Sequence, residues 1–247
     1  GVQTCALPIL SNANAQSNIA SSEISRIIKN GELKVALLNR DAPPFFYVNP
    51  NGELEGTDIR LAEKIAKELG VTVMFDRRAK SFDEVVDVVA EGKADLGISK
   101  LSRTLARAQK VALSSPYLTF HHALLINRVS FAQLSKGKPI KEVIRNFEGS
   151  IGVIQKSSYE YYAAKNFPKA KLVRYPDWPS LVKAVVMGEI TAGYRDEFEV
   201  EKIMSEDKSL ALKLRVVTLN DLSDKISVAI GIQKSGLILF VNQFLSD

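Results

Sequence analysis

The sequence has one cysteine, Cys5, so it forms no internal disulfide and no metal site built on several thiolates. Its two histidines, His121 and His122, are adjacent, and adjacent residues of a strand point to opposite faces, so a zinc site is not expected. No apolar run approaches the roughly 18–20 residues that a membrane-spanning helix needs. These absences argue against disulfide scaffolds, zinc enzymes and integral membrane proteins, and no cofactor is expected.

The chain of 247 residues has 33 Lys and Arg residues and 28 Asp and Glu residues, a net charge of +5. The basic residues are scattered among acidic ones and form no stripe with interleaved aromatic residues, so a nucleic-acid partner is not expected. A hydrophobic content of 46% is typical of globular proteins, and the length suits one large or two modest domains.

The two ends of the chain differ from its middle. Residues 1–22 carry no charge and are rich in Asn, Ser and Ala, which predicts a disordered leader. The opening GVQTCALPI resembles a translated sequencing-adapter fragment, which would mean that a signal peptide is lost and that Cys5 is not natural. At the other end an amphipathic helix breaks off at Asp247, which suggests truncation there too.

Two segments of the chain are similar to each other at a constant offset, with apolar residues and glycines in register. They read SFDEVVDVVAEGKADLGIS over 81–99 and DWPSLVKAVVMGEITAGYR over 177–195. Each predicts a short helix that ends at a glycine and is followed by a short buried strand. Strand-like runs precede both copies, at 71–75 and 171–175. The repeat therefore predicts two similar α/β lobes.

Both lobes also open alike, with a strand and then a helix. These elements are expected at 32–37 and about 58–69 in the first lobe, and at 151–154 and about 157–166 in the second. Alternating strands and helices predict a mainly parallel sheet with helices on both faces. Ligands of such sheets bind beyond the carboxyl ends of the strands, so the cleft between the lobes is the expected site.

In the first lobe, the segment SKLSRTLAR (99–107) follows the last repeat strand. Ser102 or Thr104 can cap a helix there, and Arg107 would lie in its first turn, where a cation opposes the helix dipole. Such local conflicts are frequent at functional sites, and an external anion held by the guanidinium and the helix N-terminus would resolve this one. The alternative is that Arg107 is a surface residue paired with an acidic side chain.

In the second lobe, the equivalent place holds Tyr194, Arg195 and Asp196. Arg107 and Asp196, facing each other across the cleft, would complement a zwitterion, one binding its carboxylate and the other its ammonium. The alternative is that Asp196 only caps the helix that follows it.

The sequence resembles the extracellular solute-binding proteins of family 3, the amino-acid receptors of bacterial ABC importers. The resemblance covers about residues 31–247. It rests on an ordered set of motifs: PPFFYV, NGELEGTDIRLAEKIAKELG, SFDEVVDVVAEGKADLGIS, SKLSRTLAR followed by SSPYL, IGVIQKSSYE and AGYRDEFEV.

The resemblance implies that Arg107 binds the ligand α-carboxylate and that Asp196 binds its amino group. The other candidate ligand-binding residues are Ser102 and Thr104 beside Arg107, Ser157 and Ser158 on the opposite side, Phe82 as an aromatic wall, and Ser99, Lys100 and Asn39 near the pocket. An equally good alternative for Phe82 is a core position. The resemblance further implies a periplasmic monomer that binds a small molecule, an amino acid, and an ABC permease of the inner membrane.

The implied fold is the two-lobed type II fold of periplasmic binding proteins, which closes about a hinge. We expect a leader at 1–22, lobe 1 at 23–126 plus 227–247, and lobe 2 at 127–226. The chain is expected to cross between lobes near 125–127 and near 226–228, and a final helix at 237–245 should pack on lobe 1.

The sequence departs from the family pattern in the first loop, at Asn39 and Arg40, at Lys100, where relatives often have Gly or Ser, and at 157–158, where they often have Gly-Thr. Arg40 and Lys100 add positive charge near the expected pocket, which favours an acidic amino acid or a dicarboxylate as ligand. The alternative is that both side chains point to solvent.

Two other classes of function remain open. Cyclohexadienyl dehydratase resembles the same family, and an enzyme of that kind would use Glu197 or Glu199 as a general acid. Similar domains also serve as sensory or regulatory modules of larger proteins, and the end at Asp247 leaves this possibility open.

Overall fold

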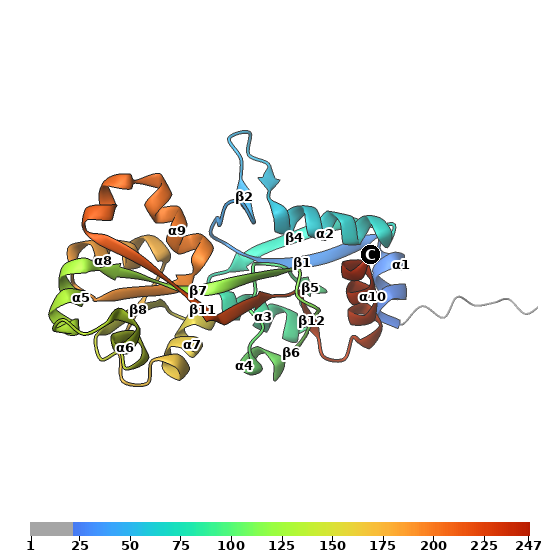
Figure 1. Cartoon of the computed structure of the whole chain (residues 1–247). Helices are drawn as coiled ribbons and strands as arrows, with labels where there is room; N and C mark the ends of the chain where they lie inside the picture. The colour runs from blue at the N-terminus through green and yellow to red at the C-terminus, as the bar shows by residue number, and fades with distance from the viewer. Residues whose placement is uncertain (1–21) are drawn as a thin grey trace, which may run out of the picture.

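The computed structural model describes residues 22–247. Two five-stranded sheets lie side by side, each with its own helices, and two long strands join them (Figure 1). The expected two-lobed α/β fold is thus confirmed. The predicted leader lies outside the described residues, except that Ser22 opens the first helix, α1 (Ser22–Asn30).

The first sheet has the strand order β4-β1-β5-β12-β6, in which β4, β1 and β5 are parallel and β12 is antiparallel to both of its neighbours. Helix α3 packs against one face through Val85 and Val89, and helices α1, α2 and α10 pack against the other through residues such as Ile27, Ile65 and Leu237. The elements of this first lobe, besides α1, are β1 (Glu32–Leu38), β2 (Tyr47–Val48), β3 (Leu54–Glu55), α2 (Thr57–Glu68), β4 (Thr72–Ala79), α3 (Phe82–Ala90), β5 (Leu96–Gly97), α4 (Leu105–Ala108), β6 (Val111–Leu113), β12 (Ala229–Gly231) and α10 (Ser235–Ser246).

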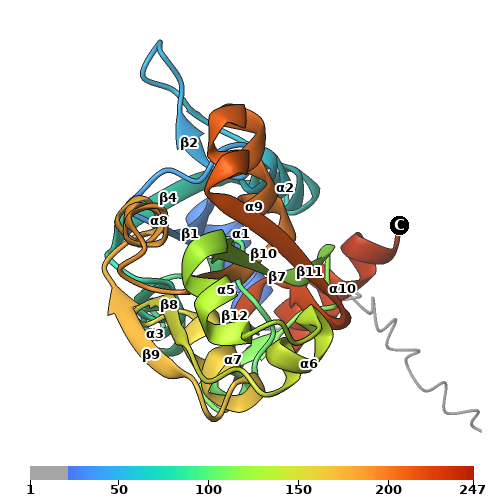
Figure 2. The same ribbon diagram turned by 60° about the vertical axis from the view of Figure 1, so that its left-hand side comes forward.

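The second sheet has the order β11-β7-β10-β8-β9, in which β10, β8 and β9 are parallel and β7 is antiparallel to its neighbours (Figure 2). Along β7, Leu124 and Ile126 pack toward α7, while Ala123 and Leu125 pack toward α8, as the alternation of a strand requires. The elements of this second lobe are β7 (Leu118–Asn127), α5 (Arg128–Ser135), α6 (Ile140–Arg145), β8 (Ser150–Ile154), α7 (Ser158–Asn166), β9 (Lys171–Tyr175), α8 (Trp178–Met187), β10 (Ala192–Asp196), α9 (Glu197–Glu206), the 3₁₀ helix η1 (Lys208–Leu212) and β11 (Leu214–Ile226).

The internal repeat corresponds to the same strand-helix-strand unit in each lobe, β4-α3-β5 and β9-α8-β10. Both helices begin at a side-chain cap, because Ser81 accepts a hydrogen bond from the Glu84 N–H and Asp177 accepts one from the Ser180 N–H. Helix α8 ends at Gly188, whose φ of 75° is in the left-handed region that glycine adopts without strain.

The chain passes between the lobes along β7 and β11. In β7, residues 122–126 pair with β10, whereas residues 118–121 pair only with β11, over 223–226. The crossing expected near 125–127 is therefore placed too late, because a continuous extended run does not reveal where one sheet ends. We propose that lobe 1 ends near residue 117, while the return near 226–228 leads directly into β12 of the first sheet.

The first and last described helices lie side by side on the first lobe (Figure 1). The Glu23 carboxylate of α1 accepts a hydrogen bond of 2.8 Å from the Gly236 N–H in the first turn of α10. The helix expected at 237–245 thus packs where it was predicted. Within residues 22–247, no helix is both long and apolar enough to cross a membrane.

Candidate functional site

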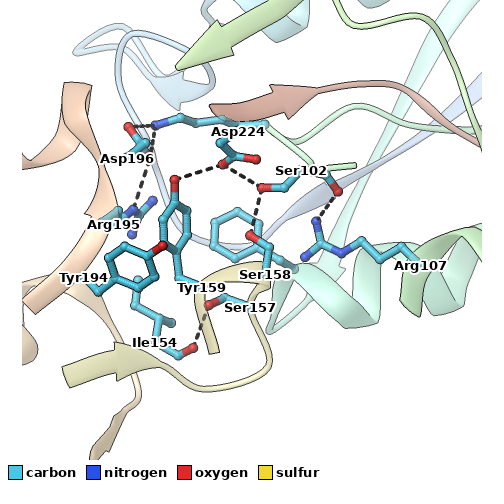
Figure 3. A pocket seen from close by; sticks show the side chains of 12 residues that line it. Ser102, Arg107, Ile154, Ser157, Ser158, Tyr159, Tyr194, Arg195, Asp196 and Asp224 are labelled. Carbon is cyan, nitrogen blue, oxygen red and sulfur yellow. Dashed lines mark hydrogen bonds and ion pairs between the residues drawn. The ribbon is translucent and has the colours of Figure 1, made fainter. Parts of the chain in front are cut away.

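A small cavity lies between the two lobes, beyond the carboxyl ends of β5, β8 and β10 (Figure 3). It has room for about 20 Å³, roughly one water molecule. Both lobes contribute its lining: Phe82, Lys100, Ser102, Arg107, Ile154, Ser157, Ser158, Tyr159, Tyr194, Arg195, Asp196 and Asp224. Charged groups from the two lobes therefore converge on one small cavity.

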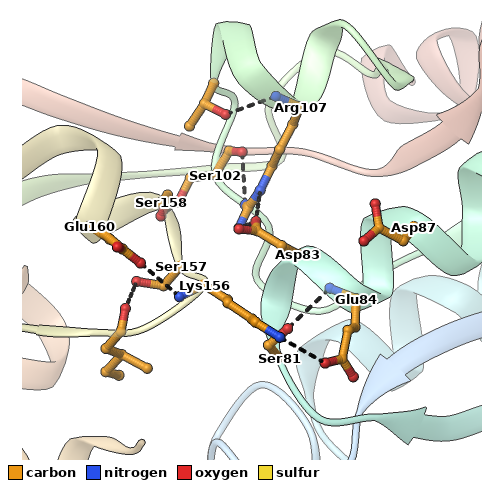
Figure 4. Close-up of polar contacts among 12 residues, drawn as sticks. Ser81, Asp83, Glu84, Asp87, Ser102, Arg107, Lys156, Ser157, Ser158 and Glu160 are labelled. Atoms are coloured by element: carbon orange, nitrogen blue, oxygen red, sulfur yellow. Dashed lines mark hydrogen bonds and ion pairs between the residues drawn. The ribbon is translucent and has the colours of Figure 1, made fainter. Parts of the chain in front are cut away.

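Arg107 belongs to the part of the cavity lining that the first lobe contributes (Figure 4). Its Nη1 donates to the Ser102 carbonyl (3.1 Å), and its Nε and Nη2 donate to Oδ1 of Asp83 (3.2 and 3.0 Å). The Thr104 hydroxyl accepts from the Arg107 N–H, so Thr104 caps helix α4 as one of the two predicted options. Arg107 does pair with an acidic residue, but it is buried in the cleft rather than on the surface, and Asp83 is the partly exposed member.

Lys100 reaches across the cleft to the second lobe. Its Nζ lies 3.0 and 3.1 Å from the two carboxylate oxygens of Asp196 and 3.0 Å from Oε1 of Glu199. Asp196 also caps α9, because its Oδ1 accepts from the Glu199 N–H (3.1 Å). Asp196 therefore caps helix α9 and also lines the cavity, so the two alternatives considered for it are not exclusive.

Arg195 lies where the small cavity opens into a larger one. Its guanidinium carbon is 5.9 Å from the Phe82 ring and 5.5 Å from the Trp178 ring. It also forms longer ion pairs with Asp196 (3.6 Å) and Glu199 (3.8 Å). Burial alone would raise the pKa of Glu199, but the adjacent Arg195 and Lys100 outweigh it and lower that pKa, so Glu199 is held as a carboxylate.

The larger cavity, of about 370 Å³, shares Phe82, Ile154 and Arg195 with the small one and continues toward solvent. Arg40 lies on its wall, where Nη1 donates to the Pro176 carbonyl (2.6 Å). Arg40 is thus near the pocket, as expected, although its side chain is half exposed.

Hydroxyl groups link the lobes at the floor of the small cavity. The Ser102 and Ser158 hydroxyls lie 2.8 Å apart, and Ser102 donates to Oδ2 of Asp224 (2.9 Å). The Tyr159 hydroxyl donates to the same oxygen (3.0 Å). Burial raises the pKa of Asp224, and the negative charge of Asp196 adds to this effect.

Most of the predicted candidates line the small cavity: Phe82, Lys100, Ser102, Arg107, Ser157, Ser158 and Asp196. Three do not. Thr104 acts as the cap described above, and Ser99 is fully buried with its hydroxyl accepting from the Leu38 N–H (3.1 Å). Asn39 is exposed and contributes only a backbone hydrogen bond to Ala79. The prediction for Ser99 is wrong because its side chain bonds to the backbone of β1 inside the first lobe, and Asn39 is exposed and absent from the lining of the cavity.

Sequence reasoning missed five lining residues: Ile154, Tyr159, Tyr194, Arg195 and Asp224. Arg195 precedes Asp196 in the repeat, so its position was a usable signal. Asp224 comes from the return strand β11, which carries no motif. Among residues 22–247, no group of three or more His, Cys, Asp or Glu side chains is arranged to hold a metal ion.

Two α/β lobes joined by a pair of strands, with a charged cavity between them, define the bilobal solute-binding proteins. Residues 33–227 match the family of bacterial extracellular solute-binding proteins, family 3, and the chain belongs to this family. The predicted family is therefore confirmed. The name of the family places its members outside the cytoplasm, which confirms the expected location as well.

The relatives include both binding proteins and an enzyme. An arginine-binding periplasmic protein of Mannheimia haemolytica is 24% identical over 66% of this chain, and the match spans 62% of that protein. Cyclohexadienyl dehydratase of Pseudomonas aeruginosa is 26% identical over 78% of this chain and 69% of its own.

Solved structures are similar over most of the chain. The ancestral amino-acid-binding protein AncCDT-1, described as a precursor of cyclohexadienyl dehydratase, has a TM-score of 0.72 at 28% identity, with 92% of each chain covered. The substrate-binding protein AbpA of Streptococcus pneumoniae, bound to L-arginine, has a TM-score of 0.72 at 27% identity, with 90% of each chain covered.

Proposed function

We propose that this protein is the substrate-binding component of an ABC importer and captures an amino acid or a related small carboxylate in the interlobe cleft. The observation that carries the proposal is the buried guanidinium of Arg107, which lines the cavity beside the Ser102 and Ser158 hydroxyls. The protein would act as a periplasmic monomer and deliver its ligand to a permease in the inner membrane. No chemical step is assigned to it.

Arg107 suits a carboxylate because its planar fork presents two N–H donors to two oxygens. These donors now point to Asp83, whose side chain is 43% exposed and can turn away when a ligand carboxylate arrives. From the other lobe, helix α7 begins after Ser157 without a side-chain cap. The Glu160 N–H donates to the Ser157 carbonyl (3.2 Å), which leaves the N–H groups of Ser158 and Tyr159 for an anion.

The cleft would open and close about β7 and β11, whose paired residues 118–121 and 223–226 join the lobes. Several contacts cross the cleft, among them the Tyr162 hydroxyl to the Arg103 carbonyl (3.4 Å) and Arg40 to the Pro176 carbonyl (2.6 Å). These contacts would stabilise the closed form that a permease recognises.

Thermal unfolding of the full chain against a panel of amino acids and small carboxylates tests this function. A ligand at 100 times its Kd should add about 2.7 kcal/mol to the free energy of unfolding and raise Tm. Arg107→Ala should abolish the shift. Arg78→Ala is the matched control, because Arg78 is 84% exposed and pairs only with Asp76 at the surface. The absence of a shift with every compound, or an equal shift in Arg107→Ala, would contradict the proposal.

A second candidate function is an acid-catalysed elimination, and the state of Asp224 favours it. The two residues expected as general acid of such an enzyme, Glu197 and Glu199, fit poorly, since Glu199 is held as a carboxylate and Glu197 accepts hydrogen bonds from His121. Asp224 lines the cavity with a raised pKa, as a general acid requires. Formation of an aromatic product from a cyclohexadienyl acid such as prephenate, lost in Asp224→Asn, would support this function over binding alone.

A further inference from the structure

Lys100 occupies the place that a ligand's ammonium would take. Its Nζ lies within 3.1 Å of both oxygens of Asp196 and 3.0 Å from Glu199, and its side chain is only 3% exposed. Asp196 is the residue expected to bind the amino group of an amino acid. That carboxylate is therefore already neutralised by a cation that belongs to the protein.

The structure holds Lys100 firmly in this position. Three aromatic rings surround its Nζ, with centroids at 4.4 Å (Phe45), 5.0 Å (Phe120) and 5.4 Å (Phe198). Its backbone has a φ of 49°, and its N–H donates to the buried Asp58 (2.7 Å). Withdrawing the ammonium would leave two buried carboxylates short of a partner, which is costly in a low-dielectric interior.

The acceptor capacity of Asp196 is mostly used. Oδ1 accepts from Lys100 and from the Glu199 N–H, and Oδ2 accepts from Lys100, while the Arg195 guanidinium lies near Oδ2 with Nε at 3.6 Å. A ligand ammonium placed here would also meet two like charges, Lys100 and Arg195, at short range.

Two cations remain that can turn toward an anion. Arg107 is one, and its partner Asp83 is partly exposed. Arg195 is the other: among residues 22–247 its guanidinium makes no hydrogen bond, only ion pairs of 3.6 and 3.8 Å, and it lies between the Phe82 and Trp178 rings where the two cavities meet.

We propose that Lys100 acts as a built-in substitute for the ligand ammonium, so that the cleft selects acids that carry two anionic groups and no α-amino group. One carboxylate binds Arg107 and the other binds Arg195. The ligand class is that of dicarboxylates and their keto or hydroxy derivatives. This inference rests on the proposed binding function and narrows it, because ordinary amino acids, basic ones above all, are excluded.

Binding to the wild-type protein tests, without any variant, whether the cleft prefers acids that lack an amino group. Isothermal titration should compare pairs of acids that differ only in the amino group, succinate with aspartate and glutarate with glutamate, and should include arginine. We expect the amine-free member to bind at least about tenfold more tightly in at least one pair, a difference of about 1.4 kcal/mol. Aspartate and glutamate both binding as tightly as their amine-free partners, or tight binding of arginine, would overturn the role of Lys100.

Lys100→Ser should reverse the preference, because it exposes Asp196 and Glu199 to the ligand. Aspartate or glutamate should then gain at least about tenfold in affinity relative to the amine-free partner. Lys110→Ser is the matched control: it makes the same charge change at a surface residue that pairs with Asp87 outside the cavity, and the preference should not change. An unchanged preference in a folded Lys100→Ser protein would contradict the inference.

The results separate the two proposals. Tight binding of an amino acid that Arg107→Ala abolishes would leave the binding function standing and overturn the inference about Lys100. Failure of every acid to bind both the wild-type protein and Lys100→Ser would overturn both.

Discussion

The ammonium of Lys100 lies 3.0 Å from Oδ1 of Asp196, and these residues occupy equivalent positions of the internal repeat, 96 residues apart. Lys100 follows β5, the strand that ends the repeat unit of the first lobe, and Asp196 is the last residue of β10, the corresponding strand of the second. The two carboxyl ends thus face each other across the cleft. Opposite charges at equivalent positions join the lobes directly.

This ion pair predicts strong energetic coupling. Lys100→Met should lower the free energy of unfolding by about 3 kcal/mol, because it leaves buried carboxylates unpaired. Asp196→Asn keeps the helix cap, and the double variant should be destabilised by less than the sum of the two single variants. Urea unfolding of the four proteins measures the coupling.

The control for this double-mutant cycle is the same set of variants at the surface pair Lys110–Asp87. Its N···O distance is 2.6 Å, and both side chains are well exposed. Its coupling should stay below about 1 kcal/mol. A coupling for Lys100 and Asp196 as small as that of the surface pair would show that the cross-cleft pair contributes little to stability.

Asp58, which fixes the backbone of Lys100, predicts a dependence of stability on pH. Burial raises its pKa from 3.8 to about 6, although the Tyr117 hydroxyl and the Lys100 N–H both stabilise the carboxylate. The folded state therefore holds this proton more tightly than the unfolded state. The stability from Asp58 is present below pH 3.8 and is lost as pH rises through about 6.

Asp58→Asn should remove that loss, which amounts to about 3 kcal/mol. Denaturant unfolding of both proteins between pH 4 and 7 measures the difference between their stabilities, with Asp41→Asn as a control at an exposed carboxylate. A difference that does not change with pH would mean that Asp58 is ionised throughout the range.

His122 predicts the opposite dependence on pH, a loss of folding stability as pH falls. Burial lowers its pKa from 6.5 to about 4, and among the described residues its Nε2 has no hydrogen-bond partner. The unfolded chain takes up this proton first as pH falls. The stability that depends on neutral His122 is therefore complete above pH 6.5 and is lost as pH falls through about 4.

His122→Phe should lose less stability between pH 6.5 and 4 than the wild-type protein, since its ring does not titrate. Tyr194, which contacts Nδ1 of His122, keeps a hydrogen bond from Asn166 (3.1 Å). His121→Phe is the control, because His121 is partly exposed. Equal loss of stability at low pH in the wild-type protein and His122→Phe would show that protonation of His122 does not destabilise the folded state.

Much of the fold could be predicted because its signals are local. The repeat indicated α3, β5, α8 and β10 through apolar spacing and helix-ending glycines. The position of Arg107 could be inferred from the conflict between its charge and the helix start. These features depend on residues a few positions apart.

The rest depends on contacts that join distant parts of the chain. Asp224 reaches the cavity through β11, and Asp58 fixes Lys100 from 42 positions away. Ser99 was misjudged because the face that a side chain takes after a two-residue strand follows from packing, here against Leu38. Lys100 was expected near the pocket, but its pairing with Asp196 becomes visible only when both lobes are assembled.

The repeated glycines of β5 and β10 predict unequal tolerance of a methyl group. A Cβ at Gly193 would lie 2.4 Å from Cδ2 of Leu181, a fully buried side chain that would have to shift. A Cβ at Gly97 would lie 3.1 Å from Cγ2 of Val89. Gly193→Ala should therefore lower the free energy of unfolding by about 1–3 kcal/mol, and Gly97→Ala by less.

Guanidinium chloride unfolding of the two variants measures this difference, and each serves as the control for the other, since the chemical change is the same. Neither glycine has a positive φ, so backbone strain does not contribute. Leu181→Ala lowers the free energy of unfolding by itself, because Leu181 is fully buried, but it also removes the atom that the new Cβ would overlap. The double variant should therefore lose less stability than the sum of the two single losses. Equal destabilisation at Gly193 and Gly97, or losses that simply add in the double variant, would show that the tight packing of α8 on β10 is not what requires glycine there.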